Sequence, residues 1–333
     1  MKTTKKFINN PKTIPQEVMC GFISANRDCL QMVGEENVIR VKELAANKVG
    51  ILIGGGITSE PLFMGYVGKN MADCAAIGNI NAAPTPFQIL HGIQAVNQRK
   101  GVLLIYNNYM GDILSFDMAE ELADEIGIPT KSVRIWDDVG SAPIDNISER
   151  RGLTGIIPVI KIAGGVASVS TDLDEIYRIT SLARDNTRTL IVAARSGSYL
   201  ESGELMFDIP ENKIKIGVGI HGETGILECE MQSVDNIANI VLDKLLEDLQ
   251  CNKSDEIALM VNSMGATSYT ELFIINNSIS KYLQTKSIRI HHTDIGFFFN
   301  SQEMLGFSIT LMKLDNELKR YFGFPANSFS YKR

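Results

Sequence analysis

The most reactive candidate in this chain of 333 residues is a histidine set among glycines. His221 lies in the segment GVGIHGETG, residues 217–225, at the expected end of a strand. Flanking glycines leave an imidazole approachable, and a neutral imidazole is a competent nucleophile toward a carbonyl carbon. The alternative is a partly buried histidine whose ring nitrogens are satisfied by backbone groups.

Three consecutive glycines form a second candidate site. Gly54, Gly55 and Gly56 follow the apolar run 49–53, at the position where α/β sheets hold ligands and where backbone N–H groups can approach them. The alternative is a tight turn with no ligand. A dinucleotide fingerprint is excluded, because Ser59 stands where its third glycine would be, and no GK[ST] sequence makes a phosphate-binding loop.

An aspartate follows the next expected strand. Asp112 comes after the segment Asn107 to Gly111, so its carboxylate could face the same crevice as the glycines and accept hydrogen bonds from ligand hydroxyls. Aspartate at this place is also a good helix N-cap, and for the residue in isolation capping is the stronger interpretation.

The other histidines and the cysteines do not predict a metal site or a disulfide. His91 lies within an expected helix, while His291 and His292 are adjacent in an expected strand and point to opposite faces. The five cysteines are widely spaced and include no CxxC pair, which fits a reducing cytosol. We expect no metal and no cofactor, and a cytoplasmic location.

The elements that position these residues alternate between strands and helices. In the first half, short β-branched runs at 49–53, 102–105 and 132–136 alternate with helical periodicity, which is typical of an α/β domain. The apolar stretch 152–169 contains Lys161 and is therefore expected to form a buried helix rather than a membrane span. Elements of the second half are expected as strands at 190–194, 214–220, 257–262, 288–291 and 307–313 and helices near 236–250 and 269–283.

The predicted fold class is therefore α/β, with two α/β domains, each a mixed or largely parallel sheet flanked by helices. The expected division is an N-terminal α/β domain over residues 1–184, with the triple glycine and Asp112, and a C-terminal α+β domain over residues 185–333, with His221. The second half is expected to contain more strand residues and fewer crossover connections than the first half.

The charge of the chain limits its partners. Lys and Arg number 32 against 39 Asp and Glu, which gives a formal charge of −7. Such a chain has no general attraction to nucleic-acid phosphates or anionic membranes, so we expect no direct nucleic-acid contact and no membrane contact. Asn9, Asn10 and Pro11 interrupt the basic N-terminus where the apolar core of a signal peptide would be.

Seven segments of the chain together carry a family resemblance. In chain order they are GGGITSEPLFMGYVG, AAPTPFQI, VLLIYNNYMGDILSF, ERRGL, KIGVGIHGETGI, VNSMGATSYTEL and GFSITLMKLD. This collinear set resembles the dihydroxyacetone-binding subunit of bacterial dihydroxyacetone kinase across almost the whole chain. The resemblance implies two α/β domains, a homodimer, and a histidine that bonds covalently to the ketone carbon of dihydroxyacetone as a hemiaminal. It places that histidine at His221, backbone contacts to the ketone at Gly55 and Gly56, and an acceptor for the hydroxyls at Asp112.

Three departures from the kinase pattern separate this chain from active members. Ser59 replaces the histidine of GGGSGHEP, Asn107 replaces a lysine, and Ala83 replaces a serine. Loss of a general base removes a factor of roughly 10² to 10⁴, so the chain is expected not to be an enzyme. The combination is similar to the family's non-kinase paralogues (DhaQ type), which implies a ligand-dependent co-activator of a TetR-type transcription activator of dihydroxyacetone kinase genes.

Two other classes of function remain alternatives. The chain could be an active substrate-binding subunit of a dihydroxyacetone kinase, with Asp112 acting as base alone and a partner carrying the nucleotide. A nicotinamide oxidoreductase is disfavoured because Ser59 breaks the glycine fingerprint.

Overall fold

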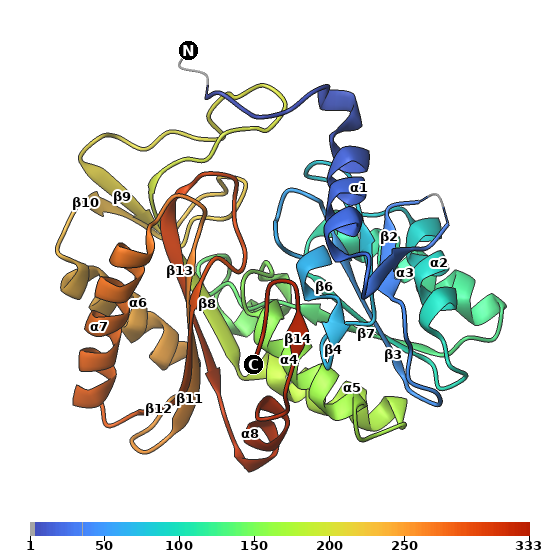
Figure 1. Cartoon of the computed structure of the whole chain (residues 1–333). Helices are drawn as coiled ribbons and strands as arrows, with labels where there is room; N and C mark the ends of the chain where they lie inside the picture. The colour runs from blue at the N-terminus through green and yellow to red at the C-terminus, as the bar shows by residue number, and fades with distance from the viewer. Residues whose placement is uncertain (1–3, 35) are drawn as a thin grey trace. The chain divides into compact units, whose positions relative to one another are not determined.

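The computed structural model describes residues 4–34 and 36–333, and the chain divides into two compact units (Figure 1). The glycine unit contains residues 7–135, 156–184 and 318–333. The histidine unit contains residues 4–6, 136–155 and 185–317. Each unit has its own six-stranded sheet, which agrees with the predicted two-domain α/β fold.

The sheet of the glycine unit is mixed, with strand order β1-β2-β5-β3-β6-β7. The strands β5, β3, β6 and β7 run parallel, while β1 and β2 pair antiparallel at one edge. Parallel strands end at the same edge of a sheet, so the chain segments that follow β3 and β6 emerge together. The bounds are β1 Leu30–Met32, β2 Val38–Val41, β3 Gly50–Gly55, β5 Cys74–Ile77, β6 Val102–Asn107 and β7 Thr130–Ile135.

Helices cover the sheet of the glycine unit because its strands are apolar on both faces. Leu52 and Leu104 belong to a core shared with α2 and α3, while the alternating residues Ile51 and Ile53 are equally buried on the other face. The further elements of the unit are η1 Pro11–Thr13, α1 Ile14–Asn26, η2 Met64–Tyr66, β4 Gly68–Lys69, α2 Pro86–Val96, α3 Met110–Glu125, α4 Ile156–Ala167, α5 Leu173–Asp185, α8 Asn316–Phe322 and β14 Asn327–Ser328.

The predicted buried helix at 152–169 is observed as α4, and every residue of this helix is buried. Lys161 is fully buried, and its ammonium donates a hydrogen bond to the backbone carbonyl of Phe324. Within the described residues, no helix is long and apolar enough to cross a membrane.

Side chains cap the N-terminal ends of two other helices. Thr85 and Gln88 form a reciprocal capping box at the start of α2. At the start of α5, the carboxylate of Asp172 accepts the N–H groups of residues 174 and 175.

The histidine unit has a mostly antiparallel sheet, with strand order β10-β9-β8-β13-β11-β12. Within the described residues of this sheet, β11 and β12 pair parallel, and the other neighbouring strands pair antiparallel. Helices α6 and α7 pack together on this sheet and share a core with β8, β11 and β13. The bounds are η3 Ile144–Glu149, β8 Thr187–Arg195, β9 Lys213–Ile216, β10 Leu227–Glu230, α6 Val234–Asp248, β11 Glu256–Ser263, α7 Tyr269–Thr285, β12 Arg289–Gly296 and β13 Leu305–Lys313.

The units are interleaved along the chain rather than contiguous. The expected boundary at residues 184 and 185 is one of the points where the chain passes from one unit to the other. Residues 136–155 nevertheless belong with the second sheet, because Asp137 and Val139 exchange backbone hydrogen bonds with Thr189 of β8. Residues 318–333 belong with the first, because β14 pairs with β4.

Candidate functional site

The histidine unit holds His221 in the loop between β9 and β10. The predicted strand 214–220 ends earlier, at Ile216, so His221 lies in the loop rather than directly at the strand end. The loop is fixed by short contacts: Gly217 N–H donates to the carbonyl of Ile191 at 2.7 Å, and the Ser301 hydroxyl donates to the carbonyl of Ile220. His221 is therefore presented by an ordered turn, and its side chain is 36% exposed.

Glu223 orients the imidazole. Its carboxylate accepts the His221 backbone N–H at 2.9 Å and lies 3.3 Å from Nδ1 of the ring. Burial opposes ionisation of this carboxyl group, yet hydrogen bonds from the His221 ring and from the local backbone lower the pKa of Glu223 to about 2. An ionised carboxylate only accepts hydrogen bonds, so of the two neutral tautomers this contact favours the one with the proton on Nδ1 and the lone pair on Nε2.

An arginine links this pair to a buried aspartate. Arg151 lies 3.9 Å from the carboxylate of Glu223 and 2.8 Å from that of Asp138. A Cβ atom at Gly219 would lie 2.2 Å from Glu223 Oε2 and 2.6 Å from Arg151 Nη1, so a side chain there would displace the two groups from these positions. Sequence reasoning did not assign a role to Glu223, Arg151 or Asp138, although the ERRGL and HGE segments contain two of them.

The glycine unit brings the remaining predicted residues to one edge of its sheet. Gly54 pairs with Tyr106 in the parallel ladder, so Gly55, Gly56 and Asn107 follow at neighbouring strand ends. The loop with Ala83 joins them, because a Cβ at Gly56 would lie 3.3 Å from Ala82 and one at Gly111 would lie 3.6 Å from the Ala83 Cβ.

The three consecutive glycines differ in what surrounds them. A Cβ at Gly55 would lie 2.1 Å from the Phe63 ring, and one at Gly54 would lie 2.7 Å from the Ala76 carbonyl. Packing therefore accounts for both of these residues. Gly56 is half-buried beside the Ala82 backbone, and it is the residue of the three that is left partly open to a ligand.

Asp112 does not cap its helix. The N-cap of α3 is Tyr109, and Asp112 lies in the first turn, 9% exposed, with no hydrogen-bond partner for Oδ1 among the described residues. The capping interpretation is therefore wrong. Burial without a compensating partner raises the pKa of Asp112 to about 7.

Asn107 has the same unusual property. It is 4% exposed, and its Oδ1 has no hydrogen-bond partner within the part of the chain that the structure describes. Buried acceptors without partners are uncommon in native structures. Here one acceptor belongs to the last residue of β6 and the other to the first turn of α3, and such a pair is typical of a ligand-binding site.

Ser59 lies in the turn after the glycines, half-buried. The neighbouring Thr58 hydroxyl donates to the Asn81 side chain at 2.6 Å and accepts the Asn81 backbone N–H at 3.2 Å. This pair ties the glycine turn to the loop before Ala83.

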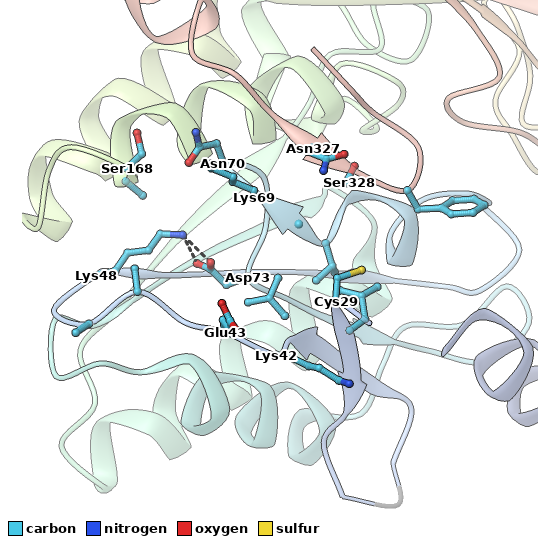
Figure 2. Close-up of a pocket in the computed structure, with 18 of the residues that line it drawn as sticks. Cys29, Lys42, Glu43, Lys48, Lys69, Asn70, Asp73, Ser168, Asn327 and Ser328 are labelled. Atoms are coloured by element: carbon cyan, nitrogen blue, oxygen red, sulfur yellow. Dashed lines mark hydrogen bonds and ion pairs between the residues drawn. The ribbon is translucent and has the colours of Figure 1, made fainter. Parts of the chain in front are cut away.

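A separate hollow of about 970 Å³ lies at the opposite edge of the same sheet (Figure 2). It is lined by residues that precede β3 and β5, including Lys48 and Asp73, which form an ion pair at 2.6 Å. None of the predicted site residues lines it, so its size does not make it the ligand site.

The other predicted absences concern metals and disulfides. The described residues contain no group of three histidine, cysteine or acidic side chains placed to hold a metal ion. All five cysteines are free thiols in the structure. His292 lies 2.8 Å from Asp294, and His91 lies 3.0 Å from Glu36, so each of these rings contacts a neighbouring carboxyl group.

The fold and these residues define a two-unit α/β protein with an oriented imidazole and buried acceptors at a sheet edge. A family model described as "Dak1 domain" matches residues 20–330, and the chain belongs to this family.

Relatives and solved structures agree with that assignment. The chain is 32% identical to "PTS-dependent dihydroxyacetone kinase 2, dihydroxyacetone-binding subunit DhaK" of Listeria innocua, over 98% of this chain and 99% of that protein. It is similar to the solved "Dihydroxyacetone kinase operon co-activator Dha-DhaQ", with a TM-score of 0.89, 28% identity and coverage of 96% and 98%. The dihydroxyacetone kinase of C. freundii gives a TM-score of 0.89 and 29% identity, over 99% of this chain and 60% of that one.

Proposed function

We propose that this protein binds dihydroxyacetone covalently on His221 and acts as a ligand-dependent co-activator of a TetR-type transcription activator of dihydroxyacetone kinase genes. The observation that carries the binding half is the contact of the Glu223 carboxylate with Nδ1 of the His221 ring, which favours the neutral tautomer with the nucleophilic lone pair on Nε2. The name of the Listeria relative, a dihydroxyacetone-binding subunit, supports the choice of ketone.

The electrons and protons of the covalent step are all supplied by the protein, the ketone and the solvent. The Nε2 lone pair forms a bond to the carbonyl carbon, and the π pair of the C=O bond moves to oxygen, which takes up one proton. The ring is then positively charged, and the ionised Glu223 beside Nδ1 stabilises it until the Nδ1 proton leaves to solvent. The product is a neutral hemiaminal, and no oxidant or cofactor is consumed.

This chemistry sets the specificity. Addition requires an electrophilic carbonyl, so short hydroxyketones are captured and glycerol, which has hydroxyls but no C=O, is not. Asp112 and Asn107 have unpartnered buried oxygens suited to accept hydrogen bonds from hydroxyl groups, and Gly56 is suited to donate from its backbone. We assign the backbone contacts of Gly55 to the ligand on the same basis of resemblance.

The absence of phosphoryl transfer is the second part of the proposal. Ser59, Ala83 and Asn107 stand where active kinase members have a histidine, a serine and a lysine, so an imidazole and a cation are missing. Losing a general base costs roughly 10² to 10⁴ in rate, and losing charge stabilisation multiplies that loss.

The regulatory half of the proposal rests on structural similarity and on charge. The solved neighbour Dha-DhaQ is named a dihydroxyacetone kinase operon co-activator, and the two chains cover one another almost completely. A formal charge of −7 suits a protein that leaves DNA contact to its partner. The ketone must bind the partner-bound form more tightly, because a ligand with equal affinity for both states shifts nothing. The homodimer stays a prediction.

One observation favours a kinase subunit as the second candidate. The pKa of Asp112, raised to about 7 by burial, is suited to a general base at neutral pH. In that case a nucleotide-bearing subunit would supply the phosphoryl group.

Two measurements test the proposal together. Incubation with dihydroxyacetone labelled with ¹³C at the carbonyl should give a tetrahedral carbon resonance and a mass increase on the peptide containing His221. Addition of a nucleotide-bearing kinase subunit and nucleotide should give no normal turnover. An unmodified ring at saturating ketone contradicts the binding half, and brisk turnover contradicts the non-kinase half.

A pull-down identifies the partner. Immobilised protein, with and without ketone, should recover a TetR-type regulator in a ketone-dependent manner. Recovery of a nucleotide-bearing subunit instead would favour the kinase alternative.

A further inference from the structure

An exposed apolar stripe runs along α3 of the glycine unit. Met110, Leu114 and Met118 are 70%, 64% and 53% exposed, and their spacing of four residues puts them on one helix face. Phe87, in the first turn of the adjacent helix α2, is 62% exposed. Helices α2 and α3 pack side by side on one side of the sheet (Figure 1). We call these four residues the α3 face.

Carboxylates continue this face toward the C-terminal end of α3. Residues 107–130 include no Lys or Arg, while the second half of α3 carries Asp117, Glu120, Glu121, Asp124 and Glu125. Asp117 is paired with Arg134 of β7 at 2.6 Å, whereas Glu121, Asp124 and Glu125 are exposed. Like charges four residues apart each cost about 0.2–0.5 kcal/mol, and carboxylates near a helix C-terminus oppose its dipole. The stability of the free helix therefore explains neither these three exposed carboxylates nor the exposed apolar stripe.

Both features fit a protein partner of opposite character. A contiguous exposed apolar patch marks an interaction site more often than a lone exposed side chain does. Its acidic border is complementary to a surface whose apolar residues are surrounded by Lys or Arg, and such complementarity selects the partner and speeds association.

A second copy of the chain fits this face poorly. A two-fold interface would bring the same patch of each copy together. An interface that brought the acidic ends of the two α3 helices together would place like charges opposite each other, with no Lys or Arg within residues 107–130 of either copy to pair them.

The position of the α3 face relates it to the candidate ligand site. Asp112 lies in the first turn of the same helix, buried, two residues after Met110. Gly111 approaches the loop with Ala83, which also lies beside Gly56. A ligand hydrogen-bonded to Asp112 therefore acts on the helix whose opposite face is exposed.

We propose that the α3 face is the docking surface for a protein partner whose apolar contact residues are bordered by Lys or Arg. The identity of that partner rests on the proposed function, in which it is the TetR-type regulator.

The test uses the full-length protein and the purified TetR-type regulator recovered in the pull-down. Leu114→Ser with Met118→Ser should weaken the Kd for the regulator at least about tenfold, because central apolar contacts dominate interface energies. Glu121→Lys with Glu125→Lys should also weaken it and should reduce its dependence on salt. Adduct formation with labelled dihydroxyacetone should be unchanged in both double variants.

A matched control exists on the other unit. Phe273 and Ile274 of α7 are 58% and 51% exposed, so Phe273→Ser with Ile274→Ser removes a similar apolar area from a different helix. This control should bind the regulator like the wild type. Weaker binding by the control than by the Leu114 and Met118 variant would place the surface on α7 and overturn the proposal.

The remaining outcomes separate this proposal from the proposed function. Equal Kd values for wild type and the α3 variants, with ketone-dependent binding intact, overturn the α3 face and leave the function standing. A wild type that forms the adduct but does not bind the regulator overturns the regulatory function and, with it, this partner. Conversion of a dimer to a monomer by the Ser substitutions assigns the face to a second copy and overturns the proposal.

Discussion

The candidate site residues of the two units differ in how completely their polar groups are satisfied. In the histidine unit, His221, Glu223, Arg151 and Asp138 form a continuous series of ion pairs and hydrogen bonds. In the glycine unit, Asp112 and Asn107 each bury an oxygen atom that has no hydrogen-bond partner among the described residues. The comparison teaches that the imidazole is oriented before any ligand arrives, whereas the glycine unit has acceptors that a ligand would complete.

Removing the oriented imidazole should have the largest effect. His221→Ala should abolish the ¹³C adduct signal completely, because no other group in that loop offers a nitrogen lone pair. His91→Ala, which alters an exposed histidine of the glycine unit, is the control and should retain the adduct. A persistent adduct in His221→Ala would place the covalent contact on another residue and remove the basis of the comparison.

Removing the group that orients the ring should have the next largest effect. Glu223→Gln deletes the negative charge beside Nδ1 and should weaken adduct formation by roughly 10- to 100-fold, as loss of a supporting carboxylate does at other histidine sites. Titration of the labelled ketone gives the apparent Kd. Glu228→Gln, on β10, is the matched control, and equal losses in the two variants would show that Glu223 acts only on the fold of the loop.

Asp112→Asn should separate affinity from stability in the glycine unit. Folding raises the pKa of Asp112 to about 7, so the native state holds this proton more tightly than the unfolded chain does. The resulting stabilisation is present below about pH 4 and is lost as the pH rises to about 7. Above pH 7 the asparagine variant should therefore be more stable than wild type, by up to about 4 kcal/mol at about 1.4 kcal/mol for each pKa unit.

The same variant should bind dihydroxyacetone about tenfold more weakly, because a charged acceptor is lost. Denaturant unfolding at pH 3 and pH 8 measures the stability, and ketone titration measures the affinity. Asp124→Asn, which removes an exposed carboxyl group of the same helix, should leave the affinity unchanged and alter the stability by no more than about 0.5 kcal/mol. A wild type as stable as Asp112→Asn at pH 8 would mean that the carboxylate is solvated and that the two units do not differ in this way.

Restoring one kinase residue should have the smallest effect. Ser59→His should recover less than about a hundredth of the turnover expected of an active member, because Asn107 and Ala83 remain changed. A coupled assay with a nucleotide-bearing subunit measures this turnover. The triple change with Asn107→Lys and Ala83→Ser should recover more. Substantial recovery from Ser59→His alone would identify position 59 as the sole defect.

Much of the fold was predictable because its signals are local. Strands β3 and β6 are continuous apolar runs, and α2 starts at a Thr-Pro pair with glutamine at the third helical position. The short strands β1, β2 and β5 were missed, since three or four residues carry too little periodicity to be recognised. The interleaving of the units was missed because backbone pairing between residues 137–139 and Thr189 is a long-range contact.

The sequence by itself determined the family resemblance and the residue types at the candidate positions. Glycines around His221, Asp112 after a strand, and Ser59 in place of a histidine are all facts of composition and order. It could not determine which role Asp112 has, because an aspartate at a helix start has the same sequence signal whether its carboxylate caps the helix or is buried.

Only the tertiary structure decided that question, by placing Tyr109 at the N-cap and burying Asp112 without a partner for Oδ1. It also decided that Glu223 and Arg151, 72 residues apart in the chain, approach within 3.9 Å, and that Glu223 contacts Nδ1 of the His221 ring. The physical reason is the same in both cases: burial and charge pairing depend on which distant segments pack together, and residue order alone does not encode those distances.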